Sequence, residues 1–257
     1  MATLSVVEHV LKAWGVPFVP IPTADDEQSD FLVTLGRSRF LIEEKTKIDD
    51  PTQLQVRHQA LDSGKTHLVV KPLVRSNRLS GIVGKAVRQL KSSSETYQYD
   101  FALVWFTGTG LHGKAYYEQF IATLYGTVGI IEMNSPYRRP CYFFQNSDFH
   151  RHATFLDGAV AAHLDHEGKV SARLCPNPLS PRAKGLRQTR FAKLFGTAVE
   201  KPRAAERSGR AYVLESDTDR RDEAALLREL QAKYKTEPLQ VMHVGYHHFA
   251  VQARDEA

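Results

Sequence analysis

The sequence predicts an α/β protein with a mixed central sheet flanked by helices, and three observations favour this class. Segments with apolar residues at helical spacing alternate with apolar runs of strand length. The chain has 257 residues and 42% hydrophobic residues, which is enough for a packed core. No stretch approaches the roughly 18–20 apolar residues of a membrane span, so we expect a cytoplasmic protein without a membrane partner.

The N-terminal elements follow from local patterns. Residues 4–14 have helical apolar spacing that ends at Gly15, and "DFLVTL" and "RFLIEEK" are strands joined by a tight turn in which Gly36 can adopt a positive φ. The proline-rich run "VPFVPIP" argues against a central strand there. Further expected elements are a helix at 51–61, a strand at 66–70, a helix at 78–91, a strand at 99–106, a helix near 111–124 and a strand near 127–133.

Apart from the short helix at 51–61, this order is α-β-β-β-α-β-α-β, and it predicts that residues 1–135 form the core sheet. Residues 136–257 are expected to form a C-terminal α+β extension that binds substrate or a partner. It contains the strand "CYFF", a hairpin that turns at "HEGK", a proline-rich loop and a final strand-helix-strand unit. Cys141 and Cys175 suggest neither a disulfide framework nor a zinc site, and we expect both to be reduced thiols.

Polar residues gather at one end of the predicted hairpin. Side chains alternate faces along a strand, so Glu43 and Lys45 project to one side and Glu44 to the other. Asp30 is about as far from the turn as Glu43, so two carboxylates and an amine meet at one end of the sheet. Mg²⁺ is commonly bound by one or two carboxylates, and a bound metal ion lowers the pKa of a water that attacks phosphorus. An ammonium can stabilise the developing negative charge.

Asp30 followed by Glu43-Glu44-Lys45 resembles the PD-(D/E)XK nuclease superfamily, whose restriction-endonuclease-like core is an α-β-β-β-α-β unit. The resemblance covers roughly residues 4–106, although Ser29 replaces the proline usual before the acid. It implies a Mg²⁺-dependent (endo)nuclease, with Mn²⁺ as a substitute metal. It implies these roles: Asp30 and Glu43 as metal ligands with the backbone carbonyl of Glu44, Lys45 as the residue that positions the nucleophile, Glu8 as an aid to the metal site, and Gln89 as a catalytic-site scaffold.

Each of these residues also has a structural interpretation. Charged residues at strand ends are often solvated or weakly paired, and Glu8 taken alone is a solvent-facing helix residue. Histidines lack the supporting acids or cysteines of a zinc site, and His150 with His152 is the best outside candidate for substrate contact.

Basic residues indicate a nucleic-acid partner. The chain has 34 Lys and Arg against 29 Asp and Glu, and residues 182–210 are strongly enriched in cations. Such cations can neutralise phosphates, although a solvated amphipathic helix gives the same pattern. The candidate nucleic-acid-binding residues are Lys47, Arg182, Lys184, Arg187, Arg190 and Lys193. Phe191, Leu194 and Phe195 are expected in the core.

The sequence therefore predicts a nuclease that hydrolyses phosphodiester bonds through metal-activated water, with DNA favoured over RNA as substrate. One alternative is a catalytically inactive protein of this fold that binds nucleic acid or serves as a subunit of a complex. Another is an unrelated enzyme with the same strand arrangement. The sequence leaves the oligomeric state open, with a homodimer or a larger complex among the options.

Overall fold

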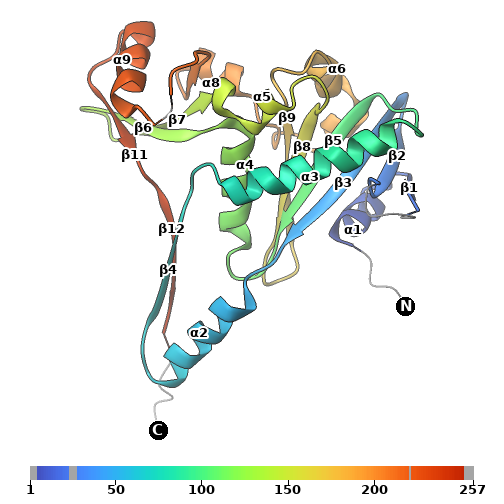
Figure 1. Ribbon diagram of the computed structural model, residues 1–257, viewed down its shortest axis with the longest axis horizontal. Coiled ribbons are helices and arrows are strands. Elements are labelled where there is room, and N and C mark those ends of the chain that lie inside the picture. Colours follow the sequence, from blue (N-terminus) through green and yellow to red (C-terminus); the bar gives the residue numbers. More distant parts are fainter. Residues whose placement is uncertain (1–4, 23–27, 220, 252–257) are drawn as a thin grey trace.

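The computed structural model describes residues 5–22, 28–219 and 221–251. At its centre lies a six-stranded sheet in the order β1-β2-β3-β5-β8-β9 (Figure 1). Its strands are β1 (Phe18–Pro20), β2 (Phe31–Leu35), β3 (Ser38–Lys47), β5 (Phe101–Gly108), β8 (Gly158–Leu164) and β9 (Val170–Pro176). β3, β5 and β8 are parallel, whereas the remaining pairs are antiparallel. The predicted mixed sheet is confirmed.

Helices cover both faces of this sheet. The helices α3 (Asn77–Ser94) and α4 (Gly113–Tyr125) pack on the face that carries Leu41 and Val104. The helices α1 (Val6–Ala13), α6 (Ala183–Gln188) and α7 (Arg190–Leu194) pack on the face that carries Ile42 and Trp105. Because neighbouring residues of β3 face opposite layers, every functional residue on this strand can be assigned to one side.

The hairpin of β2 and β3 has the predicted register. Phe31 lies opposite Ile42, and Leu35 lies opposite Ser38 beside the turn. Gly36 has φ +68°, which is the conformation expected of a glycine in this turn. Helix α1 likewise ends before Gly15, at φ +64°. Both local predictions are confirmed.

The edge strand β1 agrees with the exclusion of a central strand from the proline-rich run, whereas the strand at 66–70 differs from expectation. β1 lies within the proline-rich run and pairs only with β2, where a proline is tolerated because an edge strand has unpaired backbone groups. β4 (His67–Pro72) does not join the central sheet. It pairs with β12 (Gly245–Ala250) in a two-stranded ribbon. The ribbon extends away from the sheets, and α2 (Pro51–Asp62) lies along its far half (Figure 1).

A second sheet has the order β10-β7-β6-β11. Its strands are β6 (Val128–Glu132), β7 (Arg138–Phe143), β10 (Tyr212–Leu214) and β11 (Leu239–Met242). The expectation that the strand near 127–133 extends the central sheet is therefore wrong, since β6 belongs here. The hairpin predicted at "HEGK" is present as β8 and β9, and it extends the central sheet instead. Both sheets thus combine strands from before and after residue 135.

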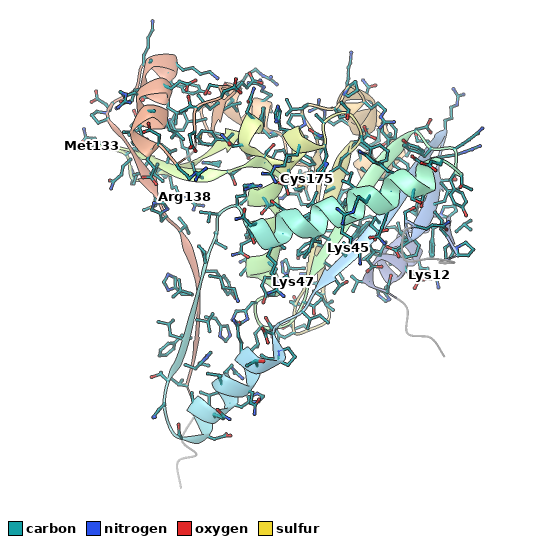
Figure 2. All side chains as sticks on the ribbon, viewed as in Figure 1. Lys12, Lys45, Lys47, Met133, Arg138 and Cys175 are labelled. Carbon is teal, nitrogen blue, oxygen red and sulfur yellow. The ribbon has the colours of Figure 1, made fainter. Side chains whose placement is uncertain are left out.

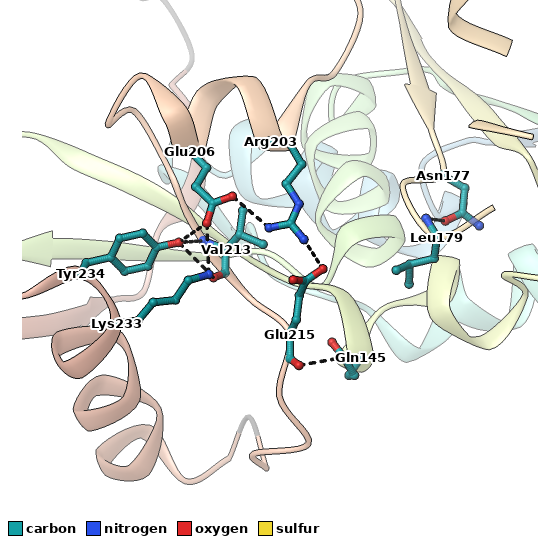
Figure 3. A network of polar contacts seen from close by, with 9 residues as sticks. All are labelled: Gln145, Asn177, Leu179, Arg203, Glu206, Val213, Glu215, Lys233 and Tyr234. Atoms are coloured by element: carbon teal, nitrogen blue, oxygen red, sulfur yellow. Dashed lines mark hydrogen bonds and ion pairs between the residues drawn. The ribbon is translucent and has the colours of Figure 1, made fainter. Parts of the chain in front are cut away.

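Polar contacts join the helices that accompany the second sheet, α8 (Pro202–Arg207) and α9 (Glu223–Tyr234). Glu206 accepts hydrogen bonds from Arg203 at 2.9 Å, Lys233 at 3.1 Å and the Tyr234 hydroxyl at 2.6 Å (Figure 3). Lys233 also donates to the carbonyl of Val213 at 2.7 Å, which ties α9 to β10. The half-buried carboxylate of Glu206 thus links α8 to α9, and Lys233 links α9 to β10.

The remaining short elements are a 3₁₀ turn, η1 (Phe144–Asn146), and α5 (Asp148–Arg151). Cys141 and Cys175 are both buried free thiols, as predicted. Among the described residues, no helix is long and apolar enough to cross a membrane.

Candidate active site

The hairpin brings Asp30 against the Glu43-Glu44-Lys45 triplet. Asp30 precedes the first residue of β2, and its backbone N–H donates to the carbonyl of Ile42 at 3.2 Å. Its Oδ2 accepts a hydrogen bond from the backbone N–H of Glu44 at 2.6 Å. The carboxyl group is therefore fixed against β3 by the backbone of the triplet.

Glu43 and Lys45 share the face of β3 that is covered by α3. The Lys45 ammonium forms an ion pair with Oε1 of Glu43. The Glu43 side chain is fully buried, whereas 20% of the Lys45 side chain is exposed. Figure 2 marks Lys45 and Lys47 beside α3. The structure thus brings together Asp30, Glu43 and Lys45, the two acids and the base that the sequence predicts at this site.

The charge of Asp30 disfavours the ionised form of Glu43, whereas the effect of Glu43 on Asp30 lowers the pKa of Asp30. Burial, followed by the charge of Asp30, raises the pKa of Glu43 to about 8. Burial also raises the pKa of Asp30, although the Glu44 N–H and the Lys45 charge oppose this shift. Lys45 offsets only part of the cost, and Oε2 of Glu43 has no hydrogen-bond partner within the described part of the chain. A buried acid pair with one neighbouring ammonium remains short of positive charge.

This donor set fits a hard divalent cation. Mg²⁺ is typically held by one or two carboxylates, with water and substrate phosphate completing its shell. Asp30 and Glu43 supply two adjacent carboxylates, and the unpartnered Oε2 of Glu43 is a free ligand atom. A bound cation would stabilise both ionised forms and lower their pKa values. Within the described ranges, no group of three or more His, Cys, Asp and Glu side chains could hold a metal ion, so any site here depends on this pair and the backbone.

Glu44 faces the opposite layer, toward the start of α1. Its carboxylate interacts with the Ser5 side chain and the backbone of Val7, and Glu8 lies close enough to raise the pKa of Glu44 by charge repulsion. Glu8 Oε2 accepts from the Ser5 N–H at 2.9 Å, and the Glu8 N–H donates back to Ser5 Oγ at 3.2 Å. Glu8 is therefore part of a capping box of α1, and the structure brings it to Glu44 rather than to Glu43.

Gln89 lies on α3 near the segment that leads into Asp30. Its Nε2 donates to the carbonyl of Gln28 at 3.4 Å. One helical turn further, Ser93 Oγ accepts from the backbone N–H of Ser29 at 2.7 Å in a buried contact. Both contacts fix the backbone immediately before Asp30, so Gln89 fits the predicted scaffolding role by way of Gln28.

Lys47 belongs to a cluster of cations that the sequence alone does not reveal. Its Nζ lies 4.8 Å from the centre of the Tyr116 ring, and Nζ of Lys71 lies 5.2 Å from the same ring. Burial and the charges of Arg78 and Lys71 lower the pKa of Lys47. These residues come from β3, β4 and α3, and no local pattern could have predicted their meeting.

Four of the other five candidate nucleic-acid-binding residues lie on the opposite layer of the sheet. Lys184, Arg187, Arg190 and Lys193 are exposed on α6 and α7. Arg182 has a structural contact instead, because its Nε donates to the fully buried Asp157 at 2.8 Å. Phe191 and Phe195 are buried as predicted, but 40% of Leu194 is exposed. The structure does not bring these cations to the layer of Glu43 and Lys45.

Histidines contribute a buried network that the sequence did not indicate. His112 Nδ1 lies 2.6 Å from Oδ1 of Asp49, and the Tyr116 hydroxyl donates to the same oxygen at 3.2 Å. Asp49 and His112 are separated by 63 positions, so only the fold reveals their contact. By contrast, His150 and His152 lie on and next to α5, and burial lowers the pKa of His152.

Comparisons with protein-family models, with curated proteins and with solved structures found no match. The functional assignment therefore depends on the site geometry and on the resemblance of its motif.

Proposed function

We propose that this chain is a metal-dependent nuclease of the PD-(D/E)XK type that hydrolyses phosphodiester bonds, with DNA favoured over RNA. The observation that carries this proposal is the meeting of Asp30, Glu43 and Lys45 on one side of a buried strand. The elements α1, β1, β2, β3, α3 and β5 follow one another in this order, with α2 and the ribbon strand β4 inserted between β3 and α3. This order, with α1 and α3 on opposite faces, supports the resemblance to a restriction-endonuclease-like core.

The roles of the side chains follow from their chemistry. Asp30 and Glu43, with the backbone carbonyl of Glu44, would hold Mg²⁺ or Mn²⁺. When bound, such an ion supplies a Lewis acid and lowers the pKa of a coordinated water. Lys45 is the one cation paired with Glu43 at this end of the hairpin among the described residues, so its ammonium can orient the attacking water and stabilise charge on phosphorus.

Gln89 has an indirect role in the proposed reaction. It contacts the backbone of Gln28 and so positions the strand that carries Asp30. A shift of the Asp30 carboxylate would misalign the pair of ligands, because metal sites and transition states depend on geometry within fractions of an ångström. We therefore describe Gln89 as a positioning residue.

Cleavage assays test the proposal. Purified protein is incubated with Mg²⁺ or Mn²⁺ and with plasmid, linear duplex and single-stranded DNA and with RNA. We expect cleavage that EDTA abolishes and that Lys45→Ala lowers by about 10²- to 10³-fold, the usual loss for one charge-stabilising group. Intact substrates in every condition, with a Lys45→Ala protein indistinguishable from wild type, would contradict the proposal.

A second candidate is a catalytically silent nucleic-acid-binding protein. It is favoured by the complete burial of Glu43 and by the ion pair that occupies its Oε1. If this alternative holds, the protein binds DNA with a steep salt dependence and leaves it uncut. The same preparation separates the two candidates, since binding and cleavage are measured independently.

A further inference from the structure

An exposed flank of α3 carries cations toward the candidate active site. Arg78 and Lys85 are exposed and seven positions apart, and Gln89 follows Lys85 by four positions. These spacings place the three residues on one side of the helix. Gln89 contacts Gln28, two residues before Asp30, so this is the flank that faces the site.

The same flank continues into the cluster on Tyr116. Arg78 lies near enough to Lys47 to lower its pKa, and Lys47 shares the Tyr116 ring with Lys71. We call the set of Lys71, Lys47, Arg78 and Lys85 the cationic track. Within the described residues none of these four forms an ion pair, although Asp49 and Asp50 lie near enough to Lys47 to act on its charge.

Several residues of α3 do not favour the stability of the helix. Its 18 residues include no acid, and Arg78 lies in the first turn, where the helix dipole disfavours a cation. Gly81 lies between Arg78 and Lys85, and a Cβ atom built there would meet nothing within 4 Å. A glycine inside a helix lowers its stability, and packing against this chain does not require one at this position.

We infer that the cationic track binds the phosphates of a DNA strand and leads it to Asp30, Glu43 and Lys45. The cleavage of the bound strand rests on the proposed function, whereas the binding of the strand does not. The seven residue steps from Arg78 to Lys85 rise about 10 Å, which matches roughly three base pairs of duplex. The site lies alongside this length, because α3 contacts Gln28 near one end and has Arg78 close to Lys47 near the other.

Binding is measured without a divalent metal, so that cleavage does not enter. The fluorescence anisotropy of a labelled DNA duplex is followed in EDTA between about 50 and 200 mM KCl. Each lost phosphate contact lowers the slope of log affinity against log salt by about 0.9, so the affinity lost over this range shrinks by about 3.5-fold. We expect this change for Arg78→Ala and for Lys85→Ala. Arg228→Ala, an exposed cation on α9, is the matched control and should keep the wild-type slope.

Gly81→Glu separates binding from folding. Glutamate favours helix more than glycine does, and its carboxylate would lie within one turn of both Arg78 and Lys85. We expect a melting temperature no lower than that of wild type together with weaker DNA binding. Unchanged binding in Gly81→Glu and Lys85→Ala, with loss in Arg187→Ala on the opposite layer, would overturn the inference.

The inference and the proposed function fail in different ways. If wild type binds DNA through the track but cleaves nothing with Mg²⁺ or Mn²⁺, the nuclease proposal is wrong and the inference of DNA binding by the track is supported. If wild type cleaves DNA and the track variants bind and cleave like wild type, the inference of DNA binding by the track is wrong and the nuclease proposal is supported.

Discussion

The carboxylate of Asp30 accepts a hydrogen bond from the backbone N–H of Glu44, with 2.6 Å between Oδ2 and N. This contact joins the acid before one strand to the middle of the triplet on the next. Since Glu43 and Glu44 point to opposite faces, it also explains how two adjacent glutamates acquire different roles. Glu43 meets Asp30 and Lys45, whereas Glu44 meets the first turn of α1.

The stability of the metal-free protein should fall as pH rises from about 4.5 to about 8. Burial and the charge of Asp30 raise the pKa of Glu43 to about 8 from its ordinary value of 4.5. Between these values the folded protein keeps a proton that the unfolded chain has released. The free energy of unfolding therefore decreases with pH, by up to about 1.4 kcal/mol per unit for one proton.

Urea unfolding across this pH range measures the effect. Glu43→Gln removes the titrating group while keeping its shape, so we expect a flatter pH dependence and greater stability than wild type near the upper end of the range. Asp30 shifts in the same direction and leaves some residual slope. An identical pH dependence in wild type and Glu43→Gln would contradict the assignment of a neutral, buried Glu43.

Substitution of Glu43, but not of the adjacent Glu44, should abolish most of the cleavage. Glu43→Gln removes a proposed metal ligand, and we expect metal-dependent cleavage to fall by at least about 10²-fold. Glu44→Gln alters a side chain on the other face and keeps the backbone carbonyl, so cleavage should persist. Rates are compared at equal concentrations of folded protein. Equal losses in both variants would show that the face assignment does not govern activity.

Glu8 distinguishes a helix cap from a metal-site residue. Glu8→Ala removes one of the two hydrogen bonds of the capping box and leaves the Ser5 cap, so we expect a loss in the free energy of unfolding at the low end of the range of about 0.5–2 kcal/mol that an N-cap side chain contributes. We expect cleavage per folded molecule to stay close to wild type, because the carboxylate of Glu8 is near Glu44. Activity lost with unchanged stability would instead support the role in the metal site that the resemblance implies.

Arg182 should matter for folding more than for binding. Asp157 is fully buried and also accepts from the Ala102 N–H at 2.8 Å and the Ser180 hydroxyl at 2.6 Å. Arg182→Ala leaves this carboxylate without its cation, and we expect about 1–3 kcal/mol of destabilisation by urea unfolding. Lys184→Ala, an exposed neighbour, is the control. Equal stability of the two variants would contradict a structural role for Arg182.

Much of the candidate site was predictable because it is local in sequence. Asp30 and the triplet are carried by one hairpin, whose turn is marked by Gly36 and whose register follows from its apolar alternation. Gln89 was predictable only through the family resemblance. The meeting of Lys47 with Lys71 and Arg78 was not predictable, because it depends on where β4 leaves β3 and on how α3 lies over the sheet.

The fold was less predictable where strands pair over long sequence distances. β4 pairs with β12, which lies more than 170 positions later, and neither short apolar run identifies its partner. The final apolar stretch was expected as one strand, yet it divides into β11 and β12, which join different sheets. The prolines at 17 and 20 correctly excluded a central strand, but an edge strand remained compatible with them.

Calorimetric titration with Mn²⁺ tests the central claim most directly. If Asp30 and Glu43 bind the ion together, the proton held by Glu43 must leave, so binding at pH 7 should release about one proton. Titrations in buffers of different ionisation enthalpy count this proton. We predict saturable binding with about one proton released in wild type, and loss of both in Asp30→Asn and Glu43→Gln. Absence of binding in wild type, or equal binding in all three proteins, would contradict the claim that this carboxyl pair is a metal site.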